Sequence, residues 1–134
     1  MCVLDPVRHI MTIVNAGHMP PMIRRAKTAR VESLGADITS PPLGIESGIE
    51  FRQATLHLEP GDLVVLYTDG VSEAPNRDGQ RYGFERINHI LKGSTNAQAF
   101  IEQLLADVRT FTQGVPQEDD VCVVAFSRQA TKAR

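Results

Sequence analysis

Two uninterrupted apolar runs lie in the second half of the chain, and each has acidic residues at one end. The first run, Leu63–Tyr67, leads into Asp69, and the second, Val121–Phe126, follows Asp119 and Asp120. Short apolar runs rich in β-branched residues predict buried strands. Because the second run is apolar at consecutive positions, we expect it to be covered on both faces. The three acids are therefore predicted to stand where strands meet solvent.

Weaker strand patterns fill the first half of the chain. A β-branched run at 10–15 is separated from a second run at 22–24 by a break that contains Gly17 and two prolines, which predicts a hairpin-like pair. Residues 31–34 predict a third, short strand. Residues 35–48 carry two prolines and three glycines, so we expect an exposed loop there.

Residues 49–58 have a partly alternating pattern that predicts another strand. A turn over 59–62 separates it from the run that ends at Tyr67, so we expect the two strands to pair antiparallel. Asp62 in this turn, and Asp78 in a later Asp-Gly reversal, are interpreted as ordinary turn residues.

The hydrophobic period changes to that of a helix after residue 83. Apolar side chains at helical spacing predict a short helix over 84–93 and a longer one over 100–111. Ser94 or Thr95 is expected to cap the longer helix, and residues 114–116, Gly-Val-Pro, to stop it. Several strands, two helices and a final strand together predict an α+β fold with sheets and helices in layers.

Length and composition limit the class of protein. The chain has 134 residues, of which 42% are hydrophobic and 22% charged, so it can bury one ordinary core. We expect a single domain over 1–134, with an ordered part from roughly 3 to 127 and a frayed polar end. The formal net charge of −2, with scattered Lys and Arg, argues against nucleic acid as a partner.

Membrane attachment and disulfide chemistry are also not expected. No apolar stretch approaches the roughly 20 residues that span a bilayer. Cys2 and Cys122 have no metal-site spacing, and Cys122 lies in an apolar run where a small buried residue fits. We therefore interpret both as reduced, non-catalytic thiols of a cytoplasmic protein.

Acids at the ends of buried strands can hold hard cations. Isolated acids of this kind are ordinarily solvated loop residues, so only the neighbouring motifs can indicate whether these acids bind a metal ion. Asp69 lies in Tyr-Thr-Asp-Gly, and Gly70 would let the chain turn beside a site without a Cβ atom. Mg²⁺ and Mn²⁺ prefer carboxylate and water oxygens, so the two junctions are candidate ligands for such an ion.

Six blocks in a recognisable order carry a family resemblance over nearly the whole chain. The chain resembles the metal-dependent protein serine/threonine phosphatases of the bacterial SpoIIE and RsbU type, which are PPM-type enzymes. The blocks are Asn-Ala-Gly-His-Met-Pro-Pro at 15–21, Pro-Leu-Gly-Ile at 42–45, Leu-Glu-Pro-Gly-Asp at 58–62, Tyr-Thr-Asp-Gly-Val-Ser-Glu-Ala at 67–74, Tyr-Gly-Phe-Glu-Arg at 82–86 and Gln-Glu-Asp-Asp-Val at 117–121.

The resemblance implies a β-sandwich flanked by helices, with a binuclear Mn²⁺ or Mg²⁺ centre at one end. By residue matching, Asp69 and Asp119 stand at metal ligands of the family. The implied substrate is phosphoserine or phosphothreonine in an anti-sigma-factor antagonist, within sigma-factor regulation and stress signalling. An upstream sensory or receiver domain is a common companion in this family.

The sequence departs from the family pattern at its start. The family's Gly-Asp-x-x-Asp segment and its Asp-x-x-Gly-His-Gly block, which supply the acid that bridges the two metals, have no counterpart here. We therefore expect the C-terminal portion of a phosphatase domain, with its N-terminal portion missing, and little or no activity from this chain alone. The alternatives are a non-catalytic, phosphatase-like interaction module and a fragment that covers its open sheet by forming a homodimer.

Other residues near the motifs have competing interpretations. His18 is a weak candidate for a catalytic acid or base, and a structural role in its Gly-His-Met-Pro turn is favoured. Glu73 either supports the Asp69 loop or caps the following turn, and support of the loop is favoured. Asp120 is an alternative metal ligand, but Asp119 matches the family ligand better, so Asp120 is assigned to support of the site. Arg24 and Arg25 either receive a phosphorylated partner or protect an exposed strand edge, and the second interpretation is favoured.

Overall fold

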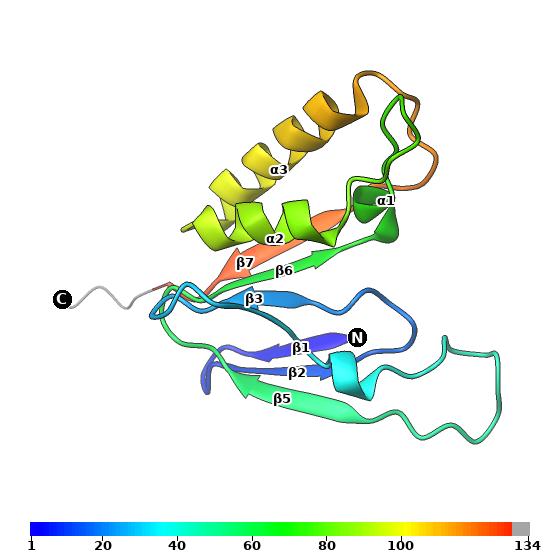
Figure 1. Cartoon of the computed structure of the whole chain (residues 1–134). Coiled ribbons are helices and arrows are strands. Elements are labelled where there is room, and N and C mark those ends of the chain that lie inside the picture. The colour runs from blue at the N-terminus through cyan, green and yellow to red at the C-terminus, as the bar shows by residue number, and fades with distance from the viewer. Residues whose placement is uncertain (130–134) are drawn as a thin grey trace.

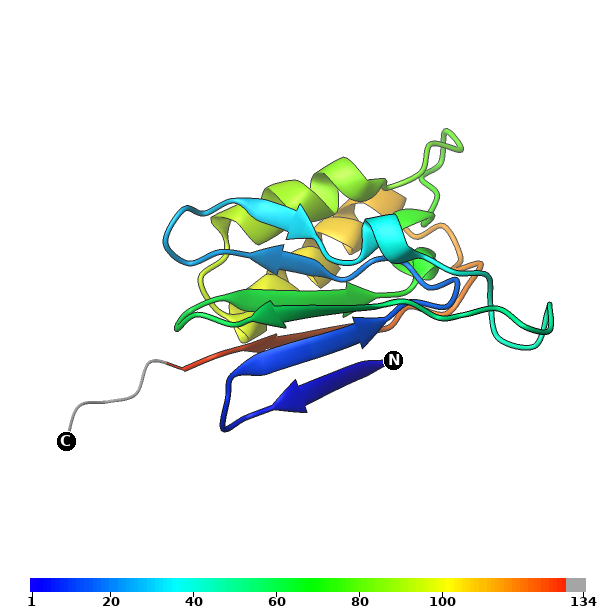
Figure 2. The ribbon, with the colours of Figure 1, turned by 90° about the horizontal axis from the view of Figure 1, so that it is seen from below.

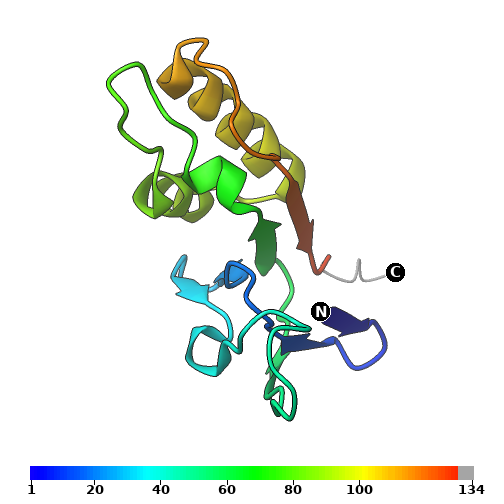
Figure 3. The same cartoon turned by 90° about the vertical axis from the view of Figure 1, so that its right-hand side faces the viewer.

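The computed structural model describes residues 1–129, which fold into three layers (Figure 1). Two antiparallel sheets stack face to face, and a pair of helices covers the outer face of the larger sheet, as the edge-on view of Figure 3 shows. The smaller sheet contains, in order, β1 (Cys2–Asp5), β2 (Ile10–Val14) and β5 (Gln53–His57). The larger contains β4 (Val31–Ser33), β3 (Met22–Arg24), β6 (Leu63–Tyr67) and β7 (Val123–Ser127). This confirms the predicted α+β sandwich flanked by helices.

The helices are α1 (Asp69–Ser72), α2 (Phe84–Gly93) and α3 (Ala97–Thr112), with a short 3₁₀ helix, η1 (Ala36–Ile38). Both long helices appear where the 3.6-residue period predicted them. The N-cap of α3 is Asn96, whose Oδ1 accepts from the Ala99 amide at 2.8 Å, so the predicted cap at Ser94 or Thr95 is wrong. Ser94 is instead buried and donates its hydroxyl to the Ile90 carbonyl at 2.8 Å.

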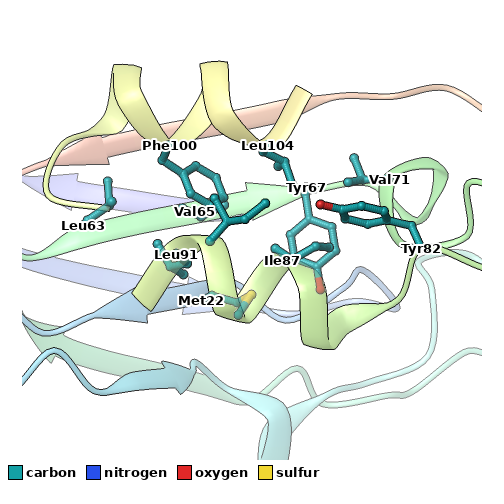
Figure 4. Packing of buried hydrophobic residues seen from close by; sticks show 11 residues of the cluster. Met22, Leu63, Val65, Tyr67, Val71, Tyr82, Ile87, Leu91, Phe100 and Leu104 are labelled. Carbon is teal, nitrogen blue, oxygen red and sulfur yellow. The ribbon is translucent and has the colours of Figure 1, made fainter. Parts of the chain in front are cut away.

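Alternate residues of the larger sheet point into two separate cores. Ile23 and Val64 face the smaller sheet, where they meet Met11 and Ile13. Met22 and Val65 face the helices (Figure 4). The helix-side core is the larger, and it is completed by Leu63, Tyr67, Val71, Tyr82, Ile87, Ile90, Leu91, Phe100 and Leu104. Burial on both faces explains why β3 and β6 are apolar at consecutive positions.

The strand pairings differ from those expected. The runs at 10–15 and 22–24 do not form a hairpin, because β2 pairs with β1 and β5 while β3 pairs with β4 and β6. Likewise β5 and β6 lie in different sheets, so the expected pairing of 49–58 with the run ending at Tyr67 is wrong. Each connection crosses from one layer of the sandwich to the other.

Asp62 anchors the second of these crossings. Its carboxylate is 1% exposed and accepts from Arg25 Nη1 at 2.9 Å, the Ala26 amide at 2.9 Å and the Glu59 amide at 3.0 Å. Asp62 does lie in a turn, but its burial and these bonds give it a structural role that the sequence did not indicate. Arg25 is bound to Asp62 and Glu32, and β3 is an interior strand, so the expectation that Arg24 and Arg25 guard a sheet edge is wrong.

The strands β1 and β7 form one open side of the sandwich. Figure 2 shows them along the same edge, opposite β4. Val124 and Leu4 are about half exposed there, at 51% and 47%. The expectation that the last strand is covered on both faces is confirmed in part, because Val123 and Ala125 pack against the helix-side core and Phe126 against the core between the sheets. It is wrong at the half-exposed Val124. Cys122 is exposed and precedes β7, so its predicted burial is also wrong.

Two features concern expectations about the remaining segments. The 35–48 loop is exposed over most of its length, as predicted, although η1 buries Ile38 within it. The polar end that was expected to be frayed includes residues 130–134, which lie outside the described residues. Between residues 1 and 129, no helix is both long enough and apolar enough to cross a membrane.

Candidate functional site

The candidate site lies where β6 and β7 end side by side. The last paired residues of this ladder are Tyr67 and Val123. Thr68 continues the contact beyond the ladder, because its amide donates to the Cys122 carbonyl at 3.1 Å and its Oγ1 accepts from the Cys122 amide at 2.9 Å. The same hydroxyl donates to the Asp120 carbonyl at 2.6 Å. Two segments some fifty residues apart are thereby held together at one end of the sandwich.

Gly70 brings the backbones of these segments into closer contact than any other residue would allow. A Cβ atom at this position would collide with the Asp120 carbonyl and lie 3.1 Å from the Asp119 carbonyl oxygen. The sequence suggested that glycine was needed for a turn, but the structure gives a different reason, the close approach of 119–120 to the first turn of α1. Asp69 and Asp119 therefore flank one tightly packed junction.

The side chains of Asp69, Asp119 and Asp120 are all exposed at this junction. Asp119 Oδ1 accepts from the Asp120 amide at 2.7 Å, and Gln117 Nε2 donates to the Asp119 carbonyl at 2.7 Å, which fixes the local conformation of the loop. The Asp69 carbonyl accepts from the Glu73 amide at 2.7 Å and so closes α1. The backbone that carries Asp69 and Asp119 is thus fixed by hydrogen bonds.

The acids fit a hydrated divalent ion better than a closed protein cage. Among residues 1–129, no group of three or more His, Cys, Asp and Glu side chains is arranged to hold a metal ion. Mg²⁺ commonly keeps several waters and binds through one or two carboxylates. Asp69 and Asp119 offer two exposed carboxylates on segments that meet at this junction, which is the donor set that such a hydrated ion would use.

The Glu73 side chain contacts the loop that follows it, which is closer to the alternative expectation of a role in the following turn than to support of Asp69. Its carboxylate forms an ion pair with Arg81, and both side chains are more than half exposed. Arg81 pairs in an isolated bridge with Pro75, so the ion pair closes the 75–81 loop against the end of α1. Through its backbone amide Glu73 also bonds Asp69, as described above. Its support of the Asp69 loop is therefore made by the main chain.

His18 lies in a turn that is organised by Asn15. The Asn15 side chain, 3% exposed, accepts from the His18 amide at 2.9 Å and donates to the His18 carbonyl at 2.9 Å. The exposed His18 ring places Nδ1 2.8 Å from the Met19 carbonyl oxygen. β2 and β6 run toward the same end of the sandwich, so this turn and α1 share that end (Figure 1). No contact joins His18 to Asp69 or Asp119 in the described residues. Asn15 was missed by the sequence reasoning, although an Asn before Ala-Gly is a recognisable turn signal.

Comparison of the sequence with known protein families gives a match over the described residues. The model of the family described as stage II sporulation protein E (SpoIIE) matches residues 1–129. The chain belongs to the SpoIIE family. This confirms the resemblance drawn from the six sequence blocks.

Curated relatives are much longer than this chain. Protein IcfG of Synechocystis is 26% identical over 129 residues, which cover 94% of the chain and 20% of the relative. Phosphoserine phosphatase RsbU of Bacillus subtilis is 35% identical over 72 residues, which cover 54% of the chain and 21% of the relative. The chain therefore spans about a fifth of the length of these relatives.

Solved structures share the fold. The phosphatase domain of SpoIIE from Bacillus subtilis superimposes with a TM-score of 0.74 at 20% identity, over 100% of this chain and 57% of that one. The RsbU and RsbW domains of Rv1364c from Mycobacterium tuberculosis give a TM-score of 0.68 at 27% identity, over 96% of this chain and 35% of that one. The three layers described above are thus part of a PP2C-type phosphatase fold.

Proposed function

We propose that this chain supplies the Asp69 and Asp119 part of the divalent-metal centre of a protein serine/threonine phosphatase in bacterial signalling. The observation that carries the proposal is the hydrogen bond from Thr68 to Asp120, which holds both acids at one end of a SpoIIE-family sandwich. The relative RsbU is named a phosphoserine phosphatase, which supports the same class of substrate.

The chemistry explains why these residues are needed. Phosphate-monoester hydrolysis is extremely slow without a catalyst, because the attacking water is weak and the phosphoryl oxygens are negatively charged. A Mn²⁺ or Mg²⁺ ion bound here would supply Lewis-acid polarisation of those oxygens. The residues of the chain fix the position of the ion: Asp69 and Asp119 provide oxygen ligands, and Gly70 and Thr68 lock their two backbones together.

Among residues 1–129, no three metal-ligating side chains are grouped so that they could hold an ion, which is fewer than a binuclear centre needs. We therefore expect the 134-residue chain by itself to hydrolyse little or no phosphoserine peptide in the presence of Mn²⁺. Within the proposal, the natural substrate is a phosphorylated anti-sigma-factor antagonist, and control comes from a sensory or receiver domain. Appreciable metal-dependent turnover by the purified chain would contradict the expected incompleteness.

Paramagnetic broadening locates the proposed ion directly. Substoichiometric Mn²⁺ added to ¹⁵N-labelled protein should broaden the amide signals of residues 68–70 and 119–121 before others. Asp69→Asn should abolish this broadening, whereas Asp78→Asn, a change in an exposed turn on the same side of the fold, should leave it intact. Broadening centred elsewhere, or equal in both variants, would contradict the proposal.

The second candidate is a non-catalytic interaction module with a phosphatase-like fold. It is favoured by one observation: among residues 1–129, no group of three or more metal-ligating side chains is arranged to hold an ion. Under this alternative, millimolar Mn²⁺ produces no site-specific broadening at all. The same experiment therefore separates the two functions.

Self-association would be a separate property of either candidate. The half-exposed Val124 and Leu4 on the open β1 and β7 side provide an apolar surface that a second copy could cover. Sedimentation should then show a dimer that Val124→Lys weakens. A monomer at all accessible concentrations would contradict this expectation.

A further inference from the structure

A cavity of about 200 Å³ opens beside the candidate metal site. It lies between α1, the C-terminal end of α3 and the loop that leads into β7. Its apolar walls come from Ala74, Pro75, Val108, Val115, Pro116 and Val121. Gly70 and Asp119 also belong to its lining, so the cavity and the candidate metal ligands share one wall.

We propose that this cavity receives an apolar side chain of the phosphoprotein substrate, a few residues from the phosphorylated serine or threonine. The inference rests on the proposed function and adds a specificity determinant to it. An extended segment advances about 3.3–3.6 Å per residue. Because Asp119 lines the cavity and is also a candidate metal ligand, the two places are adjacent, and the residue in the cavity lies a few positions from the phosphorylated one.

The volume of the cavity suits a single side chain. Small-molecule and cofactor sites occupy roughly 300–1,000 Å³, so this cavity is small for a nucleotide or a similar ligand. It is large enough for the side chain of Leu, Met or Phe. Burying such a side chain against the valines would contribute hydrophobic binding energy that a flat surface does not offer.

The charges around the cavity give no particular attraction for a phosphate. Its polar lining includes one cation, Arg109, and three acids, Glu73, Glu118 and Asp119. Glu73 is paired with Arg81, and Asp119 is a candidate metal ligand, which leaves Glu118 to balance Arg109. The cavity therefore has no excess positive charge for an anion, so we place the phosphate at the metal and a neutral side chain in the cavity.

The cavity is held open by contacts that do not involve its occupant. Arg77 Nη2 donates to the Gln113 carbonyl at 3.0 Å, and the Val115 amide donates to the Thr112 carbonyl at 3.0 Å. Val108 and Val121 pack at the same time against the helix-side core. A binding site that exists before its ligand arrives loses little ordering entropy on binding.

A leucine scan of phosphopeptides tests the proposal with the full 134-residue chain and Mg²⁺. Each peptide holds one phosphoserine in a Gly-Ser sequence, with a single Leu placed at one of three positions on either side. Peptides with Leu at one position, or at either of two adjacent positions, should bind about tenfold more tightly than the peptide without Leu. These peptides should also shift the amide signals of Val115 and Val121. The same peptides without phosphate should bind more weakly than their phosphorylated partners.

Matched variants on α3 show whether the cavity itself carries the preference. Thr112 lines the cavity, whereas Thr110 is exposed on the same helix and outside it. Thr112→Phe should fill the cavity and remove the leucine preference, and Thr110→Phe should retain it. A flat leucine scan, or a preference that persists in Thr112→Phe, would overturn the proposal.

Two separate measurements distinguish a failure of the cavity proposal from a failure of the proposed function. Titration with Mg²⁺ alone reports the metal site through the amides of 68–70 and 119–121. The leucine scan reports the cavity through Val115 and Val121. A null metal titration contradicts the proposed function, and a flat leucine scan contradicts the cavity proposal whatever the metal titration gives.

Discussion

The Thr68 hydroxyl donates to the Asp120 carbonyl at 2.6 Å while it accepts from the Cys122 amide at 2.9 Å. This one oxygen therefore joins the end of β6 to the loop before β7. The two candidate metal ligands are neighbours of the joined residues, Asp69 beside Thr68 and Asp119 beside Asp120. The geometry of the site depends on this contact more than on any contact between the acids themselves.

Removing the Thr68 hydroxyl should loosen the junction. Thr68→Val keeps the shape of the side chain but leaves the Cys122 amide and the Asp120 carbonyl without their partner. We expect the free energy of unfolding to fall by about 1–3 kcal/mol, measured by urea denaturation. Thr68→Ser, which retains the hydroxyl, is the control and should lose clearly less. Equal losses in both variants would show that the hydrogen bonds contribute little.

A methyl group at position 70 should separate the two backbones. In Gly70→Ala the new Cβ meets the Asp120 carbonyl, so we expect a destabilisation of about 1–3 kcal/mol from overpacking. Gly93→Ala in α2 is the matched control, because nothing lies within 4 Å of its Cβ position, and it should be neutral or slightly stabilising. A neutral Gly70→Ala would contradict the close approach.

Neutralising Asp62 should affect stability without affecting the metal site. The buried carboxylate holds Arg25 and two backbone amides at the crossing from β5 to β6. Asp62→Ala leaves the Ala26 and Glu59 amides without their acceptor and removes one of the two carboxylates that bind Arg25, so unfolding should become easier by about 1–3 kcal/mol. Asp78→Ala in an exposed turn should change stability by less than about 0.5 kcal/mol. A loss from Asp62→Ala no larger than that of the control would rule out the anchoring role.

High pH should destabilise the helix-side core through Tyr82. Burial, and next the hydrogen bond to Asp107 at 2.7 Å, raise the pKa of Tyr82 well above its usual range. The folded state therefore holds this proton more tightly than the unfolded state, and stability falls as pH rises above about 10, the ordinary Tyr value. Denaturation between about pH 9 and 11 should show this loss, and Tyr82→Phe should reduce it. Tyr67, whose pKa burial also raises, should account for a remaining part.

The sequence predicted the helices better than the sheet, for a physical reason. A stripe such as Phe100 and Leu104 reports the face of one helix, which is local information. Strand patterns report burial but not the partner strand, so the run Leu63–Tyr67 was correctly predicted to be a buried strand while its neighbours in the sheet were not. The hairpin and the β5–β6 pair were therefore wrong, because both connections cross between layers.

Only those residues of the candidate site that lie in a recognisable sequence motif could be predicted. Asp69 and Asp119 could be named from their motifs, and their roles as ligands remain predictions. The contacts that hold them, from Thr68 and Gly70, depend on the β6–β7 register and could not be derived from spacing. The buried role of Asp62 was missed for the same reason, since its partner Arg25 lies 37 residues away in the chain.

Calorimetric titration of Mn²⁺ tests directly whether Asp69 and Asp119 bind one ion together. The wild-type chain should bind in the submillimolar to millimolar range with a stoichiometry near one. Asp69→Asn and Asp119→Asn should each weaken binding at least about tenfold, the range for a lost metal-site interaction, and the double variant should be little worse than either single one, because both act on one site. Saturable binding that survives both substitutions, or a stoichiometry near two that falls to one in each single variant, would contradict a shared site.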